Sequence, residues 1–177
     1  LCQRPPGTRV NPVKAQIVLA THNPRPDLLE LQLGSLIAQT VSDWQCLVLD
    51  DASNDRSTVA KALIDPRFML LPPHEHLGPY RAFEQLLTRA SDLPVFLCDQ
   101  DDYWHPEKLE RMLAVPGTAF SAMRVVDETG SVVRDRFLPP PSDLTPAGLL
   151  LMNCVSGTAL KISPQVRAAA IPFPAPS

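Results

Sequence analysis

The chain has 177 residues, 45% of them hydrophobic, which is enough for one domain with a substantial core and too few for two. Its net charge of -3, without any cluster of Lys and Arg, argues against a nucleic-acid surface and predicts no nucleic-acid partner. No apolar run approaches the roughly 20 residues of a bilayer span and no signal segment opens the chain, so we expect a cytoplasmic protein without a transmembrane segment, either free or peripheral to the inner face of the membrane.

The opening residues 1–12 are rich in proline and have neither helical nor strand periodicity, so a tail is expected there. Residues 13–177 are predicted to form a single domain. The chain begins with Leu and ends in the proline-rich stretch Ile171–Ser177, a composition typical of linkers, so we expect a piece of a longer protein truncated at its C-terminal end. Cys2 falls in the tail, whereas Cys46, Cys98 and Cys154 lie in apolar runs and are expected to be free buried thiols.

Strand and helix patterns alternate through the first two thirds of the chain. The apolar runs typical of buried strands are Ala15–Ala20, Gln45–Asp50, Arg67–Leu71 and Pro94–Cys98. The expected helices run from an N-cap at Asp27 to Gln39, over Ser57–Ile64, along the face shared by Phe83, Leu86, Leu87 and Ala90, and over Pro106–Ala114. This alternation predicts parallel strands joined by right-handed helical crossovers, an α/β sheet flanked by helices.

The last third of the chain has a different pattern. Ala119–Asp127 and Ser131–Arg136 flank a Glu-Thr-Gly turn and predict a hairpin, the first antiparallel signal in the sequence. A short helix near Thr145–Met152 and a strand near Val155–Ile162 are expected to complete this smaller antiparallel part.

Polar residues follow three of the predicted strands. They are Thr21-His22-Asn23, Asp50-Asp51 and Asp99-Gln100-Asp101-Asp102. The carboxyl ends of parallel strands meet at one edge of a sheet, so these side chains are expected to converge there. At an extended strand end, residues two apart point the same way, so Asp99 and Asp101 can aim both carboxylates at one point while Gln100 faces elsewhere. Paired carboxylates suit Mg²⁺ or Mn²⁺, which often complete their coordination with phosphate oxygens.

Simpler explanations stay open for each of these signals. An Asp-x-Asp arises by chance in a chain this rich in Asp, and an acidic turn before Pro106 is ordinary at a helix start. The Asp50–Asp55 segment also suits a turn that caps the next helix. His74 and His76 have the spacing of a metal pair, but no further ligand is near them in sequence and a plain loop is expected. Trp104 and Phe83 are expected in the core rather than as platforms for a ligand.

Five segments, taken in order, carry a likeness to a known family. They are Ile17–Asn23, Leu36–Thr40, Val48–Ser57, Asp99–Leu109 and Asn153–Pro174. The second matches a Ser-Leu-x-x-Gln-Thr helix end, the third an Asp-Asp-x-Ser-x-Asp-x-Ser/Thr segment, and the fourth a metal loop followed by Trp, Pro and Lys-Leu. The combination, which covers residues 13–174, resembles the inverting family 2 glycosyltransferases of the GT-A fold, which include many bacterial rhamnosyl- and related transferases.

The resemblance implies a GT-A fold, with a mostly parallel Rossmann-like sheet flanked by helices and a smaller antiparallel part. It implies transfer of a sugar from a UDP- or dTDP-sugar donor to a hydroxyl of a glycan or lipid-linked acceptor in cell-surface polysaccharide synthesis, with Mg²⁺ or Mn²⁺ as cofactor. By the same resemblance, the donor-binding residues would be Ala20, Thr21, His22, Asn23, Asp51, Arg81 and Asp99. Asp101 would be the principal metal ligand, with Asp99 beside it, and Gly157 and Thr158 would lie on the acceptor side.

Two departures from the family pattern bear on function. The segment Gly78–Ala82 lacks the Asn of the family's Gly-x-x-x-Asn. The family's catalytic base, a carboxylate often in a His-Asp or Glu-Asp pair, follows the segment matching Ile171–Pro174, where this chain stops. No base is therefore identified, and nothing in the context of Asp127 or Asp143 recommends either one. A non-catalytic domain or fragment that binds nucleotide sugar remains the alternative, and a plain interaction domain is a third possibility.

Overall fold

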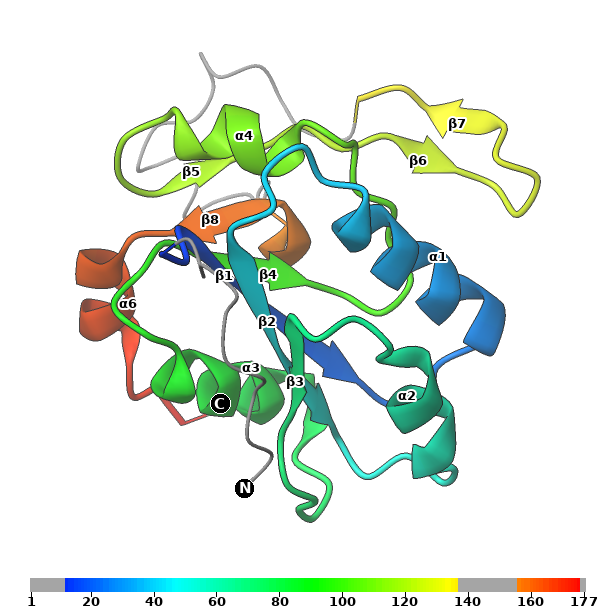
Figure 1. Cartoon of the computed structure of the whole chain (residues 1–177). Coiled ribbons are helices and arrows are strands. Elements are labelled where there is room, and N and C mark those ends of the chain that lie inside the picture. Colours follow the sequence, from blue (N-terminus) through cyan, green and yellow to red (C-terminus); the bar gives the residue numbers. More distant parts are fainter. Residues whose placement is uncertain (1–11, 137–155, 176–177) are drawn as a thin grey trace, which may run out of the picture.

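The computed structural model describes residues 12–136 and 156–175, in which a six-stranded sheet carries helices on both faces (Figure 1). The strand order is β3-β2-β1-β4-β8-β5. β1 runs parallel to its neighbours β2 and β4, and β2 runs parallel to β3. β8 is antiparallel to both β4 and β5. The predicted α/β class with a mostly parallel sheet is confirmed.

The strands of the main sheet are β1 (Ala15–Thr21), β2 (Trp44–Asp50), β3 (Phe68–Leu70), β4 (Val95–Cys98), β5 (Ala119–Phe120) and β8 (Leu160–Ile162). The helices are α1 (Pro26–Ile37), α2 (Arg56–Ala62), α3 (Gly78–Arg89), α4 (Lys108–Leu113) and α6 (Pro164–Ala170), with a 3₁₀ turn, η2, at Gly157–Ala159. A separate hairpin pairs β6 (Val125–Val126) with β7 (Val132–Arg134).

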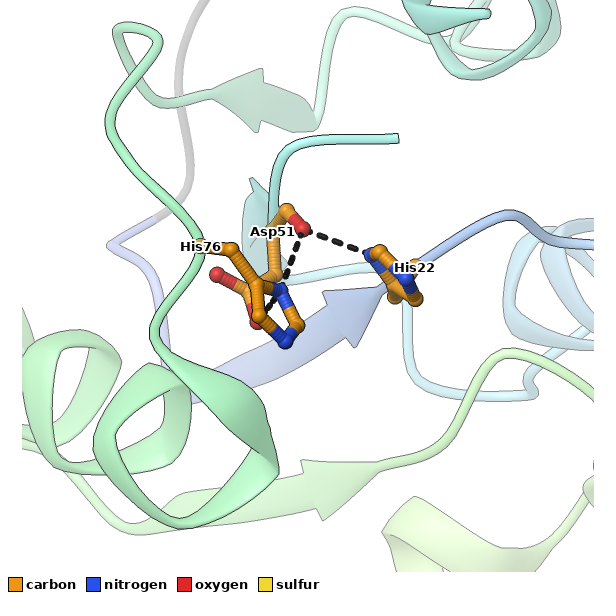
Figure 2. Close-up of side chains that lie close together, drawn as sticks. All are labelled: His22, Asp51 and His76. Carbon is orange, nitrogen blue, oxygen red and sulfur yellow. Dashed lines mark hydrogen bonds and ion pairs between the residues drawn. The ribbon is translucent and has the colours of Figure 1, made fainter. Parts of the chain in front are cut away.

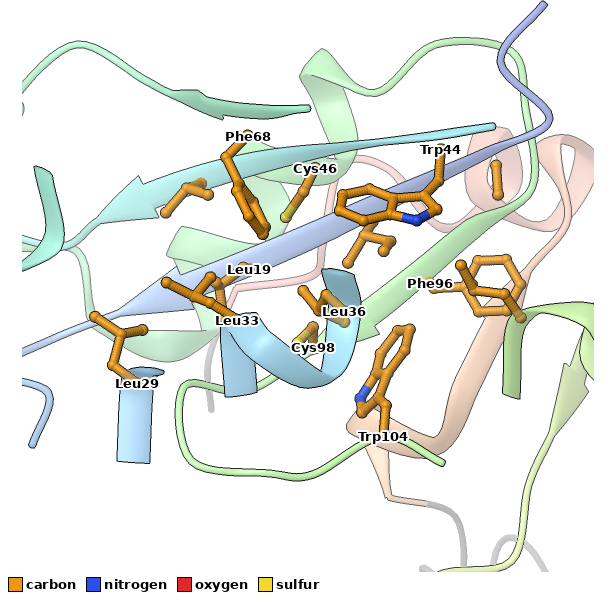
Figure 3. Close-up of a cluster of buried hydrophobic side chains, with 14 of the residues drawn as sticks. Leu19, Leu29, Leu33, Leu36, Trp44, Cys46, Phe68, Phe96, Cys98 and Trp104 are labelled. Atoms are coloured by element: carbon orange, nitrogen blue, oxygen red, sulfur yellow. The ribbon is translucent and has the colours of Figure 1, made fainter. Parts of the chain in front are cut away.

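Both faces of the sheet are buried, which explains why the central strands are continuously apolar. Successive residues of a strand point to opposite faces, so Ile17 and Leu19 pack with α1 and α2 while Val18 packs with α3. Figure 3 shows the buried cluster on the face that packs with α1 and α2, in which Trp104 lies beside Phe96. The core role predicted for Trp104 is therefore confirmed, and Cys46 and Cys98 are free and buried as predicted.

Several predicted boundaries are wrong, for local reasons. α1 begins at Pro26 with Arg25 as its N-cap, because proline fits a first helical turn whose N–H groups have no partner. Asp27 lies in that first turn and pairs with Arg25 instead of capping. α4 begins at Lys108, two residues later than expected. α6 was not predicted, although Ser163 before Pro164 is a helix-start signal, and its hydroxyl does accept the backbone N–H of Val166.

The antiparallel part is also smaller than predicted. The hairpin exists only between β6 and β7, since Ala119–Phe120 forms a separate strand of the main sheet. The predicted strand over Val155–Ile162 is reduced to β8, and the residues before it form η2. The predicted helix near Thr145–Met152, Cys154, Asp143 and nearly all of the predicted tail lie outside the described residues.

A buried lysine joins β8 to the end of α4. Lys161 is 2% exposed, and its ammonium group donates to the backbone carbonyls of Met112 and Val115. Lys161→Met keeps the length of the side chain but removes the charged donor from both carbonyls. The Met112 carbonyl keeps the N–H of Val115, whereas the Val115 carbonyl loses its partner, so we expect the free energy of unfolding to fall by about 1–3 kcal/mol. Urea unfolding followed by circular dichroism measures this loss. Lys61→Met, on the exposed surface of α2, is the control and should change stability by less than about 0.5 kcal/mol; an equal effect would contradict the assignment.

Candidate functional site

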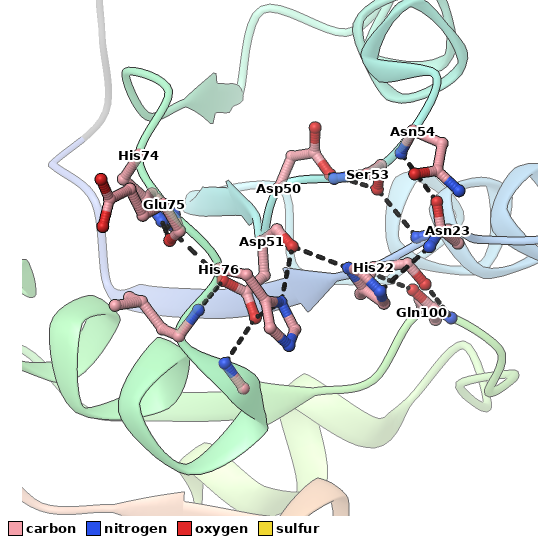
Figure 4. Close-up of polar contacts among 12 residues, drawn as sticks. His22, Asn23, Asp50, Asp51, Ser53, Asn54, His74, Glu75, His76 and Gln100 are labelled. Carbon is pink, nitrogen blue, oxygen red and sulfur yellow. Dashed lines mark hydrogen bonds and ion pairs between the residues drawn. The ribbon is translucent and has the colours of Figure 1, made fainter.

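The loops after β1, β2 and β4 are tied to one another at one edge of the sheet. Thr21 pairs with Asp50 in the strand register, and the backbone N–H of Asp51 donates to the carbonyl of Thr21 at 2.7 Å. The backbone N–H of His22 donates to Oε1 of Gln100 at 2.8 Å. The predicted meeting of these strand ends is confirmed (Figure 4). Gln100, which was expected to face elsewhere than Asp99 and Asp101, contacts the backbone of His22.

Asn23 fixes the first loop against the second. Its backbone N–H donates to Oγ of Ser53 at 2.8 Å, and its side-chain oxygen accepts the N–H of Asn54 at 2.8 Å. Asn23 has a φ of +44°, a conformation that Asn tolerates better than most residues. The preceding Thr21 is buried, and its hydroxyl has no hydrogen-bond partner within the described part of the chain. Ala20, just before it, is partly buried.

The adjacent carboxylates of Asp50 and Asp51 serve different parts of the fold. Asp50 is buried, accepts hydrogen bonds from Ser53, and lies 3.1 Å from Nε of Arg56. The prediction that the Asp50–Asp55 segment caps the next helix is confirmed at its last residue, because Asp55 caps α2 by accepting the N–H of Ser57. Protein groups thus compensate the charge of Asp50.

Asp51 holds the start of α3. Its side-chain oxygens accept the backbone N–H groups of Leu77 at 2.7 Å and Gly78 at 2.8 Å. α3 has no side-chain cap from its own N-cap residue, so this carboxylate satisfies two N–H groups at the positive end of the helix dipole. Gly78 adopts a φ of +76°, which only glycine reaches without strain. Asp51 is 3% exposed, and its contact with a donor stays a prediction.

Three of the chain's four histidines lie around Asp51. Nδ1 of His22 is 2.7 Å from the Asp51 carbonyl oxygen, and Nδ1 of His76 is 3.0 Å from Oδ2 (Figure 2). The two rings are 4.7 Å apart, and one ligand atom from each of His22, Asp51 and His76 lies within 4.8 Å of the others. His74 and His76 lie in a loop, as expected, but His76 has ligand candidates from distant parts of the chain, a group that does not include His74. Two imidazoles and a carboxylate suit Zn²⁺ better than Mg²⁺ or Mn²⁺.

The acidic turn Asp99–Asp102 follows β4 directly. β4 ends at Cys98 and residues 100–101 form a turn, so the extended-strand argument for aiming Asp99 and Asp101 together is wrong. Asp101 is exposed, whereas Asp99 is partly buried. Burial, and then the charges of Asp102 and Asp101, raise the pKa of Asp99 to about 6. A bound cation would offset this repulsion, so the oxygen donors fit Mg²⁺ or Mn²⁺, and their role as ligands stays a prediction.

Lys108 connects the acidic turn to the predicted acceptor side. Its ammonium group donates to the carbonyl of Thr158 at 3.0 Å and lies 3.8 Å from the centre of the Trp104 ring. Burial lowers the pKa of Lys108 to about 8. The pKa of Asp102 is raised by burial, although a hydrogen bond from Thr158 and the charge of Lys108 oppose that rise.

A cavity of about 410 Å³ opens beside Asp99. It is lined by Pro79, Tyr80, Phe83, Leu97, Asp99, Gly157, Thr158 and Phe173. The structure thus brings Gly157 and Thr158 beside Asp99. Their place on the acceptor side stays a prediction. Phe83 was expected in the core, but it is only partly buried and contributes to this wall.

Arg81 lies in α3, and its guanidinium contacts Glu84 and Phe173. Its guanidinium pairs with Glu84 at 2.6 Å and donates to the carbonyl of Phe173 at 3.4 Å. Its contact with a diphosphate stays a prediction. Asp127, one of the two later carboxylates, accepts hydrogen bonds from Thr129 and Ser131 in the β6–β7 turn, and these lower its pKa.

Asp99→Asn tests whether ionisation of Asp99 destabilises the folded chain. The raised pKa of Asp99 means that the folded chain keeps this proton up to about pH 6, whereas the unfolded chain releases it near 3.8. Ionisation therefore costs stability as the pH rises between these values. In metal-free buffer, Asp99→Asn should stabilise the fold at pH 7 by on the order of 1 kcal/mol, with a smaller gain at pH 5. Urea unfolding at both pH values measures this, and a gain that is no larger at pH 7 than at pH 5 would contradict it.

Comparison with known proteins identifies relatives for most of the described chain. The model of "Glycosyl transferase family 2" matches residues 16–117. TuaG of Bacillus subtilis, named for a glycosyltransferase of teichuronic acid biosynthesis, is 27% identical over 137 residues, covering 73% of this chain and 54% of its own length. WfgD of Escherichia coli, named as a UDP-Glc:alpha-D-GlcNAc-diphosphoundecaprenol beta-1,3-glucosyltransferase, is 31% identical over 101 residues, covering 56% of this chain and 39% of its own.

Solved structures share the fold. The mannosyltransferase PcManGT from Pyrobaculum calidifontis, in complex with GDP-Man and Mn²⁺, superposes with a TM-score of 0.55 at 23% identity, covering 65% of this chain and 36% of its own. TarS from S. aureus, in complex with UDP-GlcNAc, gives a TM-score of 0.51 at 24% identity, covering 57% and 30%. The GT-A fold is therefore shown.

The matches cover only part of each relative. The chain spans from a quarter to about half of the length of the curated relatives it matches. Among the described residues, no helix has both the length and the apolar character needed to cross a bilayer.

Proposed function

Because the chain belongs to glycosyl transferase family 2, we propose that it binds a nucleotide-diphosphate sugar at the carboxyl ends of β1, β2 and β4 and takes part in transferring the sugar to an acceptor hydroxyl. The observation that carries this proposal is the meeting of His22, Asp51 and the acidic turn Asp99–Asp102 at one edge of the sheet, within the segment that the family matches. Ligands of open α/β sheets bind at such edges.

In the proposed site, the nucleoside lies against the loops after β1 and β2. The candidate contacts are Ala20, Thr21, His22, Asn23 and Asp51. The orphan hydroxyl of Thr21 supports this placement, because a buried polar atom without a partner favours a ligand that supplies one. A UDP- or dTDP-sugar is the proposed donor, and the name of WfgD as a UDP-Glc enzyme supports uridine. The likeness to rhamnosyltransferases concerns shared motifs and assigns no sugar.

The diphosphate lies between the acidic turn and α3 in this proposal. Asp101, with Asp99, would hold Mg²⁺ or Mn²⁺, and Arg81 would add a second positive charge. Such an ion neutralises the negative charge that develops on the departing nucleotide diphosphate. Burial, and then the charges of Asp102 and Asp101, raise the pKa of Asp99, and a cation at this place would favour its ionised form.

Transfer to the acceptor would take place beside Gly157 and Thr158, where the cavity adjoins Asp99. An inverting reaction needs a base that takes the proton of the attacking hydroxyl, and no described residue is assigned that role. A glycan or lipid-linked acceptor is proposed, since TuaG is named for teichuronic acid biosynthesis and WfgD for a sugar linked to diphosphoundecaprenol. A nucleotide-sugar-binding domain without transfer activity is the second candidate, because no base is assigned among the described residues.

Isothermal titration of the chain with UDP, dTDP or GDP, in the presence and absence of Mn²⁺, tests donor binding. We expect binding that requires the metal and prefers UDP or dTDP. The absence of metal-dependent heat with every nucleotide would overturn the proposal. Turnover of UDP-sugars in the presence of lipid-linked acceptors then separates the two candidates, because the non-catalytic domain would bind the donor without consuming it.

A further inference from the structure

The polar residues at the end of α1 are bonded to the segment that follows the acidic turn. Oγ of Ser35 accepts the backbone N–H of Trp104 at 3.0 Å. Nε2 of Gln39 donates to the carbonyl of His105 at 2.9 Å, and its Oε1 accepts the N–H of Leu109 at 3.0 Å. The backbone N–H of Thr40 donates to the carbonyl of Pro106 at 2.9 Å. These four hydrogen bonds join residues 35–40 to residues 104–109.

Gln39 replaces a cap that α4 lacks. The N-cap residue of α4, Glu107, makes no side-chain hydrogen bond to the helix start, and Leu109 is the second residue of that helix. Its N–H would have no partner inside the helix, and Oε1 of Gln39, just after α1, accepts it. Gln39 is 6% exposed, so its contacts with His105 and Leu109 are largely shielded from water. Loss of this amide would leave a buried N–H and a carbonyl unpaired.

These contacts fix both ends of the acidic turn. Asp99 follows β4, which is held between β1 and β8, and Trp104 is held by Ser35 and by burial in the core. The mutual repulsion of the carboxylates between these anchors would otherwise favour a more open turn. Fixed anchors keep the carboxylates together in the absence of a cation, which is the preorganisation that a ligand set needs.

We infer that Gln39, with Ser35 and Thr40, is a positioning residue for the acidic turn Asp99–Asp102, through which it sets the affinity of the metal-dependent nucleotide site. This inference rests on the proposed function. Gln39 touches no proposed ligand and acts through the backbone of residues 104–109.

Gln16 provides a matched control. It is 4% exposed, and its Oε1 accepts the N–H of Ser91 at 2.6 Å and the hydroxyl of Ser91 at 3.0 Å. Gln16 therefore also clamps a loop next to β4, but at the amino end of that strand, opposite the acidic turn. Gln39→Leu and Gln16→Leu are the same chemical change at two buried amides, and similar losses of unfolding free energy are expected.

The experiment compares metal-dependent UDP affinity with stability in both variants. Titration with UDP and Mn²⁺ should show a loss of about 10- to 100-fold in Gln39→Leu, the usual effect of removing a residue that orients metal ligands. Gln16→Leu should bind within about twofold of the wild type. Ser35→Ala removes the contact with Trp104 and a local hydrogen bond to the Gln32 carbonyl within α1. It leaves Gln39 in place and should fold even if Gln39→Leu does not; a loss of affinity is expected for it as well.

Failure of the positioning role and failure of the proposed function give different results in these titrations. Equal affinity losses in Gln39→Leu and Gln16→Leu, or wild-type affinity in Gln39→Leu and Ser35→Ala, would overturn the positioning role alone. No metal-dependent UDP binding in the wild-type chain would overturn the proposed function and the inference with it.

Discussion

Asp101→Ala should abolish Mn²⁺-dependent binding of a nucleoside diphosphate while leaving the fold intact. Asp101 is exposed in the turn after β4 and makes no hydrogen bond or salt bridge within the described part of the chain. Its removal therefore should change the free energy of unfolding by less than about 0.5 kcal/mol. The loss of a principal metal ligand should weaken metal-dependent affinity by at least about 100-fold, since such an ion contributes several kcal/mol. Isothermal titration with UDP and Mn²⁺ measures the loss.

Two further variants make this result specific. Asp92→Ala removes an exposed carboxylate at the amino end of β4 and should bind as the wild type does. His76→Ala tests the imidazole cluster around Asp51 as the alternative metal site. Wild-type metal dependence in Asp101→Ala, combined with its loss in His76→Ala, would move the ion from the acidic turn to the cluster of His22, Asp51 and His76.

Asp51→Ala should produce the largest loss of stability among the variants at the site. The substitution leaves the N–H groups of Leu77 and Gly78 without their carboxylate acceptor, in a place that is almost closed to water. Hydrogen bonds to charged groups contribute more than neutral ones, so we expect the free energy of unfolding to fall by about 3 kcal/mol. Urea unfolding in the absence of any nucleotide measures this loss.

The comparison variants for Asp51 separate a structural role from a ligand-binding role. Asp51→Asn keeps one acceptor oxygen for one of the two N–H groups and should lose less stability than Asp51→Ala. Asp55→Ala removes the exposed cap of α2 and should cost about 1 kcal/mol. Wild-type stability in ligand-free Asp51→Ala would show that the carboxylate does not hold α3.

The structural role of Asp51 has a consequence for the donor site. The carboxylate that the family resemblance assigns to the nucleotide also fixes the start of α3, the helix that carries Arg81. Nucleotide contacts at Asp51 and diphosphate contacts at Arg81 would then depend on the same helix start. Asp51→Asn is expected to weaken donor binding even where it retains most of the stability.

Local patterns in the sequence predicted the frame of the molecule. The apolar runs at β1, β2 and β4 are recognisable because strands buried on both faces are continuously apolar. α1 is recognisable because its apolar residues recur at helical spacing. The polar residues after β1, β2 and β4 predicted the edge at which these loops meet, since parallel strands end on the same side. Short elements were predicted poorly: β8 has three residues and α6 seven, too few for a period to show.

The contacts across that edge depended on tertiary structure. The sequence separates His22 from Asp51 by 29 positions and Asp51 from His76 by 25, so no local spacing indicated that they meet. Similarly, Gln39 and Leu109 are 70 positions apart. Hydrophobic periodicity is a property of neighbouring residues and determined the strands, the helices and the edge where their ends gather. The partner of each buried polar group depends on how the loops fold over that edge, and only the packed structure decided that Asp51 caps α3 and that Gln39 holds the acidic turn.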